Sequence, residues 1–165
     1  MNEDAYAEWL VKRKDPVYAI PAKIGMVLVL IVTLILAMQT LIGTILLIAA
    51  AIATYFVFIN LSVEFEYLFV DGDLSIDRVL GKARRKKLLD CKKEEIQIVA
   101  PADSYMLKDY EKAGMKVYDC TSRRGEAKIY ALIYHKGADC VKVLMEPNDR
   151  ILRSMRYNIP SKLVK

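Results

Sequence analysis

The chain contains 40 consecutive residues, from Ile24 to Val63, without a single Asp, Glu, Lys or Arg. As one helix this run would extend about 60 Å, twice the roughly 30 Å hydrocarbon thickness of a bilayer. Two shorter helices joined by a tight turn fit it better. The polar or helix-loosening residues of the run lie near its midpoint: Gln39, Thr40, Gly43 and Thr44. We therefore predict a transmembrane helical hairpin with spans near residues 22–38 and 42–60.

Two other interpretations of the apolar run are less favoured. A pair of buried helices in a soluble protein would need covering on all sides, which a chain of 165 residues can hardly supply. A cleaved signal peptide has an apolar region of only about 7 to 15 residues near the N-terminus. Here the run begins after residue 23 and is far longer.

The flanking charges predict the orientation of the hairpin. Four basic residues precede the first span: Lys12, Arg13, Lys14 and Lys23. The turn between the spans has no charge, so the positive-inside rule places the N-terminus in the cytoplasm. An even number of crossings returns the chain to the same side. We thus expect a cell-membrane protein with an N-terminal cytoplasmic segment (1–21), two spans (22–61) and a cytoplasmic domain (62–165).

Aromatic residues lie before the first predicted span and at the end of the second. Four residues of the N-terminal segment have helical spacing: Tyr6, Trp9, Leu10 and Arg13. They predict an amphipathic helix on the inner leaflet, with Tyr6 and Trp9 at headgroup depth, and a solvated helical arm is the alternative. At the end of the second span, Tyr55 and Phe58 are predicted to form part of an aromatic belt.

From Ser62 onward the hydrophobic pattern changes to a period of two. Val63, Phe65, Tyr67 and Phe69 alternate with Glu64 and Glu66, as in a half-buried strand. Asp71-Gly72 then predicts a two-residue hairpin turn. Six further strands are expected at short spacing: Asp73 to Leu80, Arg84 to Leu89, Glu95 to Ala100, Lys116 to Cys120, Lys128 to His135 and Val141 to Met145. This is an α+β pattern with about seven mainly antiparallel strands.

Two other segments complete the predicted domain. The charged, Tyr-rich stretch from Ala102 to Gly114 suggests a longer connection with a helical turn. A terminal amphipathic helix is expected at about 148–157, with Asn148 as its N-cap and Asp149 at its positive dipole end. This helix would cover an open end or face of the sheet.

The order of seven strands followed by one helix resembles the pleckstrin-homology (PH) fold. The resemblance to bacterial PH-like membrane proteins rests on particular segments: Phe65-Glu66-Tyr67-Leu68-Phe69, Gly72-Asp73-Leu74-Ser75-Ile76, the basic strand, Ile96 to Pro101, and Glu146-Pro147-Asn148. The stretch from Glu8 to Lys14 is also similar to a family of small bacterial membrane proteins. The resemblance implies a PH-like antiparallel barrel or sandwich at the membrane and brings no catalytic residues.

In eukaryotic relatives of the PH fold, basic residues in the loop between the first two strands hold phosphoinositide headgroups. On the predicted strand order, this loop is Asp71-Gly72-Asp73, which is short and acidic. We therefore do not transfer the phosphoinositide pocket to this chain.

The densest cluster of charge follows the membrane hairpin and has three interpretations. We define it as the basic cluster: Lys82, Arg84, Arg85, Lys86, Lys87, Lys92 and Lys93. It could contact anionic lipid or a partner, or be a solvated edge strand whose charges oppose aggregation. Nucleic-acid binding is the remotest interpretation, because the Tyr residues that might stack on bases mostly stand at strand positions.

Little in the sequence supports catalysis or a cofactor. His135 is the only histidine, so a histidine-based metal cluster cannot be argued, and there is no Walker-type loop. The three cysteines, Cys91, Cys120 and Cys140, are an odd number without paired CxxC spacing and are expected to pack as small hydrophobes. We expect no enzyme and no cofactor.

The resulting functional hypothesis is a non-catalytic, membrane-anchored module. Its domain would recruit an unknown protein partner or associate with copies of itself at the lipid bilayer, where tethering raises the effective concentration. A sensor of anionic lipid that uses the basic cluster is the alternative hypothesis.

Overall fold

The computed structural model describes residues 6–125, 127–137 and 139–164. The chain divides into two compact units. The helical unit comprises Lys14–Val63 and Val79–Arg84, and the β unit comprises Met1–Arg13, Glu64–Arg78 and Arg85–Lys165. Each unit is therefore built from segments that are separated in the sequence.

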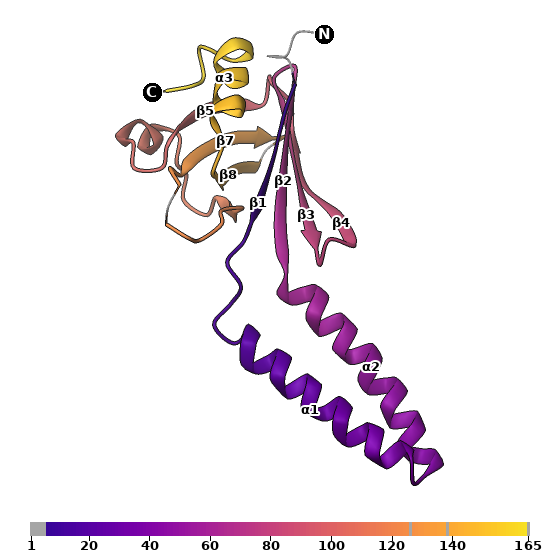
Figure 1. Ribbon diagram of the computed structural model, residues 1–165. Coiled ribbons are helices and arrows are strands. Elements are labelled where there is room, and N and C mark those ends of the chain that lie inside the picture. Colours follow the sequence, from indigo (N-terminus) through magenta and orange to yellow (C-terminus); the bar gives the residue numbers. More distant parts are fainter. Residues whose placement is uncertain (1–5, 126, 138, 165) are drawn as a thin grey trace. The chain divides into compact units, whose positions relative to one another are not determined.

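The helical unit contains the two predicted apolar helices. Helix α1 spans Ala19–Ala37 and helix α2 spans Leu41–Leu61, and they pack against each other as a hairpin (Figure 1). The side chain of Thr40 caps α2 by accepting a hydrogen bond from the Gly43 backbone N–H at 3.0 Å. Both helices are long and apolar enough to cross a membrane, and most of their apolar side chains are exposed. The predicted helical hairpin is confirmed.

The turn that follows strand β3 (Asp73–Leu80) packs onto the end of α2 within the helical unit. The Gly81 N–H donates a hydrogen bond to the Ser62 carbonyl at 2.8 Å. A Cβ added at Gly81 would lie 2.9 Å from the Ile59 Cα, and Gly81 has a φ of +54°. Only glycine allows this close approach without strain.

Replacing Gly81 with alanine is expected to lower the thermal stability of the full chain in detergent more than replacing Gly114 does. Gly114 also has a positive φ, +79°, but no heavy atom lies within 4 Å of its missing Cβ. Both substitutions incur left-handed strain of roughly 1–2 kcal/mol, and only Gly81→Ala adds overpacking of about 1–3 kcal/mol. Equal losses for the two variants would contradict the close contact with α2.

The β unit contains two four-stranded sheets. Strands β1 (Tyr6–Lys12), β2 (Val63–Val70), β3 and β4 (Arg84–Cys91) follow one another in the first sheet. The second sheet has the order β5-β7-β8-β6, formed by β5 (Ile96–Pro101), β7 (Tyr130–Lys136), β8 (Asp139–Met145) and β6 (Lys116–Asp119). Strands β6 and β8 are parallel. No closed barrel forms among the described strands, so the barrel alternative is wrong and two sheets replace it.

Strand β1 corrects the prediction for the N-terminal segment. Residues 6–12 form a strand that pairs antiparallel with β2, from Tyr6 opposite Val70 to Lys12 opposite Glu64 (Figure 1). The expected interfacial helix is therefore wrong, and the described residues contain eight strands. Side chains alternate between the two faces of this strand, and the buried Ala7 and Val11 lie on the same face. A stretch of seven residues can satisfy both helical spacing and this alternation, and pairing with β2 favours the strand.

The same finding changes which loop joins the first two strands. Strands β1 and β2 are connected by residues 13–62, so both helices are an insertion between paired neighbours in one sheet. The assignment of Asp71-Gly72-Asp73 to this loop is wrong. Those residues belong to the β2–β3 hairpin, where Asp71 and Gly72 have φ values of 52° and 102°. The predicted two-residue turn itself is confirmed.

The remaining predicted elements, a short helical turn and the terminal helix, pack against the sheets of the β unit. A 3-10 helix, η1 (Tyr105–Asp109), lies in the expected long connection, and its Leu107 packs into a cluster with Ile98 and Ile133. Helix α3 spans Asp149–Asn158. Its N-cap is Asn148, which accepts a hydrogen bond from the Ile151 N–H at 2.9 Å, as predicted. Helix α3 buries one apolar face and contacts β1.

Candidate functional site

A buried tyrosine joins the two sheets of the β unit. Tyr67 on β2 is fully buried, and its hydroxyl donates to the Cys120 carbonyl at 2.7 Å and accepts from the Glu146 N–H at 3.3 Å. Ser122 donates from Oγ to Glu146 Oε1 at 3.0 Å. These contacts hold the segment after β6 and the segment after β8 against β2.

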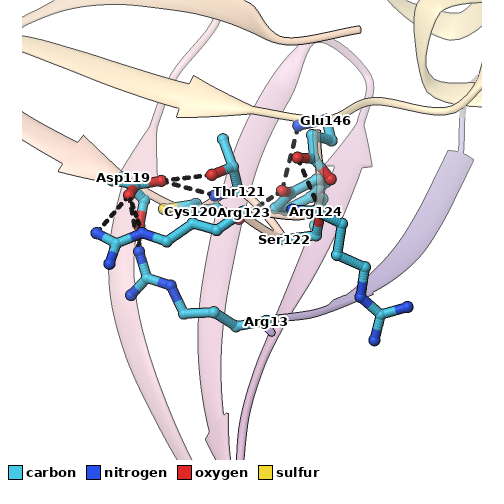
Figure 2. A network of polar contacts seen from close by, with 9 residues as sticks. Arg13, Asp119, Cys120, Thr121, Ser122, Arg123, Arg124 and Glu146 are labelled. Atoms are coloured by element: carbon cyan, nitrogen blue, oxygen red, sulfur yellow. Dashed lines mark hydrogen bonds and ion pairs between the residues drawn. The ribbon is translucent and has the colours of Figure 1, made fainter. Parts of the chain in front are cut away.

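The acidic centre of the neighbouring polar network is Asp119 (Figure 2). Its Oδ2 accepts from Arg13 Nη2 at 2.8 Å and from Arg123 Nε at 2.7 Å. Its Oδ1 accepts from the N–H and the hydroxyl of Thr121. Burial raises the pKa of Asp119, but the hydrogen bonds from Thr121 and Arg123 and the charge of Arg13 outweigh it and lower the pKa below its ordinary value. Arg13, the residue that follows β1, is thereby fixed to the second sheet.

Replacing Asp119 with asparagine should destabilise the β unit by about 1–2 kcal/mol at neutral pH, because charged hydrogen bonds are lost. The lowered pKa means that the carboxylate contributes stability above its ordinary pKa of 3.8, and this contribution disappears as the pH falls through the folded-state pKa. Urea unfolding of the full chain in detergent between pH 3 and pH 7 measures both effects. If the free energy of unfolding decreases with falling pH as steeply in Asp119→Asn as in the wild type, this role of Asp119 is contradicted.

A cleft lies beside the network and runs along β1. It has a volume of about 410 Å³. One wall is formed by four consecutive residues of β1, from Trp9 to Lys12. The opposite wall comes from the two segments that Tyr67 holds in place: Ser122, Arg124, Ala127, Glu146, Pro147 and Asn148. The cleft is therefore built from a strand edge and two well-anchored loops.

The cleft combines an exposed aromatic side chain with basic groups. By register, Trp9 shares the face of β1 that carries the buried Ala7 and Val11, yet Trp9 is 41% exposed. Lys12 and Arg124 are exposed, and neither has an ion pair with a described residue. Figure 2 shows the Arg124 guanidinium extending away from the network. Such a site can bind a ligand with apolar and acidic groups.

The basic cluster lies on β4 and on the turns before and after it. Lys82 and Arg84 belong to the helical unit, whereas the other five residues belong to the β unit. Arg85 forms an ion pair with Glu66, and its Nε lies 3.9 Å from Asp77 Oδ2. Lys87 donates to Asp90 at 2.8 Å. Contact of this cluster with lipid or a partner remains a prediction.

The residues predicted at the membrane interface also lie on different elements. Tyr6 and Trp9 stand on β1 and not on a helix. Tyr55 and Phe58 lie in the last two turns of α2 and are exposed. Their contact with headgroups stays a prediction.

Two of the three cysteines pack as small hydrophobic residues. Cys91 and Cys120 are fully buried, and burial raises the pKa of each thiol to about 12. A thiol with so high a pKa is a poor nucleophile at neutral pH. Cys140 is partly exposed and free.

These features define a class of protein: a two-sheet PH-like domain that carries a pair of apolar helices between its first two strands. The family described as "Bacterial PH-like domain (DUF6106)" matches residues 3–165, and the chain belongs to this family. The predicted relationship to bacterial PH-like proteins is confirmed. No curated protein and no solved structure matches the chain.

Sequence reasoning missed most of the cleft. Trp9 was singled out as a lipid contact, and Arg124, Glu146 and Ser122 were not assigned to any site. One signal was present, because Ala7, Trp9 and Val11 alternate with Glu8, Leu10 and Lys12 as in a strand. The position of the opposite wall depends on pairings that this local pattern does not contain.

Proposed function

We propose that this protein is a non-catalytic interaction module anchored in the cell membrane, whose PH-like domain binds a protein partner on the cytoplasmic side. The observation that carries the proposal is the cleft along β1. Its exposed Trp9 and its two cations, which form no ion pair with a described residue, are suited to binding rather than to a reaction. Membership in a PH-like family supports an interaction role.

The anchoring role rests on α1 and α2. Both helices leave most of their apolar surface uncovered by the described residues, which distinguishes them from core helices of a soluble domain. A bilayer would cover this surface, and 19 and 21 residues are sufficient to cross it. The basic residues before α1 favour a cytoplasmic location for both termini.

Site-specific photo-crosslinking in native membranes tests the proposal. A benzoylphenylalanine is placed, one position at a time, at exposed sites of the β unit: Leu10, Tyr105, Tyr110 and Tyr157. We expect at least one position to give a discrete protein adduct that is absent without illumination. If all four positions give only lipid adducts, the protein-interaction function is excluded, and carbonate extraction tests the membrane anchor independently.

Binding of anionic lipid is a second candidate, and one contact favours it. Lys82 and Arg84 flank the turn that Gly81 fixes against Ile59 and Ser62 at the end of α2. If α2 crosses the bilayer, these two cations stand where the helix leaves it, at headgroup level. Each basic group near an anionic surface contributes about 1 kcal/mol.

Native mass spectrometry of the full chain with phosphatidylglycerol or phosphatidylcholine tests this second candidate. We expect the affinity for phosphatidylglycerol to decrease roughly thirtyfold in Lys82→Gln/Arg84→Gln, since two such contributions, about 2 kcal/mol together, are lost. Lys92→Gln/Lys93→Gln is the matched control, because it removes the same charge from the same basic cluster but from the β unit. Equal lipid retention by both double variants would eliminate the candidate.

A further inference from the structure

Strand β1 is the edge of its sheet, and its outer side has no backbone partner. It pairs with β2 alone, and none of residues 6–12 takes part in any other backbone hydrogen bond with the described residues. In an antiparallel strand, alternate residues direct their N–H and C=O groups away from the neighbouring strand. β1 therefore presents a row of backbone donors and acceptors that no described strand satisfies, and its residues Trp9 to Lys12 line the cleft.

Two other sheet edges of the β unit, β5 and β4, are protected. The segment after α3 covers β5: the Val99 N–H donates to the Lys162 carbonyl, and the Val164 N–H donates to the Val99 carbonyl, both at 2.8 Å. Strand β4 carries four consecutive charged residues, Arg84 to Lys87, and charges oppose pairing with another strand. β1 has no charged run. Helix α3 contacts β1, but Trp9 to Lys12 line the open cleft, and Trp9 and Leu10 are 41% and 48% exposed.

The charges around the cleft indicate what kind of strand would fit. Lys12 stands at the end of β1 on one wall, and Arg124 stands on the other. The carboxylate of the cleft, Glu146, is buried and already accepts a hydrogen bond from Ser122. An incoming segment would thus meet two available cations. Acidic side chains complement these cations, and apolar side chains would cover Trp9.

We propose that the cleft binds an extended, acidic segment of a partner protein, which adds to the sheet as a strand alongside β1. This inference rests on the proposed interaction function and assigns to it a site and a ligand chemistry. Main-chain hydrogen bonds to β1 provide affinity, Lys12 and Arg124 select acidic side chains, and Trp9 is covered by the bound segment. The loops on the opposite wall are held by Tyr67 and Ser122, so the site is preformed.

Selection from a library tests the ligand chemistry. Random nine-residue peptides displayed on phage are selected against the full chain in nanodiscs and, separately, against Lys12→Glu/Arg124→Glu. Both side chains are exposed and have no ion pair with a described residue, so the variant should fold, which thermal unfolding checks. We expect peptides rich in Asp and Glu from the wild type and basic peptides from the variant. No enrichment, or the same sequences from both targets, overturns the inference.

The selected peptide then reports on the binding mode. Trp9 is the only tryptophan of the chain, so intrinsic fluorescence observes the cleft directly. We expect a blue shift on binding, at least tenfold weaker binding to Lys12→Glu/Arg124→Glu, and a similar loss when alternate peptide nitrogens are methylated. Only the set of nitrogens that faces β1 should be sensitive to methylation. Binding without a change in Trp9 emission, or binding that is unaffected by methylation of each set in turn, overturns strand addition.

Crosslinking separates this inference from the proposed function. If the Leu10 adduct disappears in Lys12→Glu/Arg124→Glu, the cleft is the partner site. If the wild type and the variant capture the same partner equally, the interaction function stands and the cleft inference fails. A third result is possible: the crosslinker at Leu10 captures a second copy of this chain, and the phage selection enriches no peptide. This result assigns the β1 edge to a homodimer and overturns the acidic-peptide site.

Discussion

A chain that begins at residue 62 should fail to fold cooperatively, although it contains seven of the eight described strands. β1 lies before the helices in the sequence, so such a chain loses the strand that pairs with all of β2. It also loses the buried Ala7 and Val11 and the Arg13–Asp119 ion pair. The unpaired β2 edge would promote aggregation.

A chain in which a short turn replaces the helices should fold and stay soluble. Because Lys12 stands opposite Glu64, the sequence Arg13-Asn-Gly-Val63 would join β1 to β2 with a two-residue hairpin turn. We expect cooperative urea unfolding for this joined chain and none for residues 62–165. Val11→Asp in the joined chain is the control. A charge at this buried position should remove the cooperative unfolding of the joined chain, so that it behaves like residues 62–165. Cooperative unfolding of residues 62–165 with equal stability would show that β1 is dispensable.

Replacing Tyr67 with phenylalanine is expected to destabilise the β unit by roughly 2–5 kcal/mol. The substitution keeps the ring but leaves the buried Cys120 carbonyl and Glu146 N–H without the hydroxyl, and each unsatisfied group costs about 1–3 kcal/mol. That is a large part of the roughly 5–15 kcal/mol that stabilises a typical domain. Urea unfolding of the full chain in detergent measures the change.

Tyr134→Phe is the matched control for this prediction. Tyr134 is also buried, but its hydroxyl makes no hydrogen bond with the described residues, so its loss should change the free energy of unfolding by less than about 1 kcal/mol. Because the Tyr67 contacts hold both loops of the cleft, Tyr67→Phe should also weaken binding of a selected peptide. If the two Tyr→Phe variants are equally stable, the hydroxyl of Tyr67 does not join the sheets as described.

The local elements of this protein could be predicted because strong local patterns specify them. The apolar run predicted two helices whose observed bounds, Ala19–Ala37 and Leu41–Leu61, lie within three residues of the expected spans. The Asp71-Gly72 turn and the Asn148 cap were predicted from residues that favour those conformations. Strand Asp73–Leu80 was predicted from its alternation.

The candidate site could not be predicted to the same extent. Lys12 and Arg124 are more than 100 positions apart in the sequence, and they face one cleft only because β1 pairs with β2 and Tyr67 anchors the loops. In the basic cluster, the most conspicuous local feature, Arg85 and Lys87 form ion pairs with Glu66 and Asp90.

The sequence alone determined the helical hairpin, most of the strands, the terminal helix and the family, because these depend on hydrophobic periodicity and on turn and cap residues close together in the chain. Only the tertiary structure decided that residues 6–12 form a strand, that the helices are an insertion within a sheet, and that a cleft opens beside Trp9. Seven residues carry too few periods to distinguish a helix from a strand, so hydrogen bonding to β2, about 60 positions away, decides their conformation.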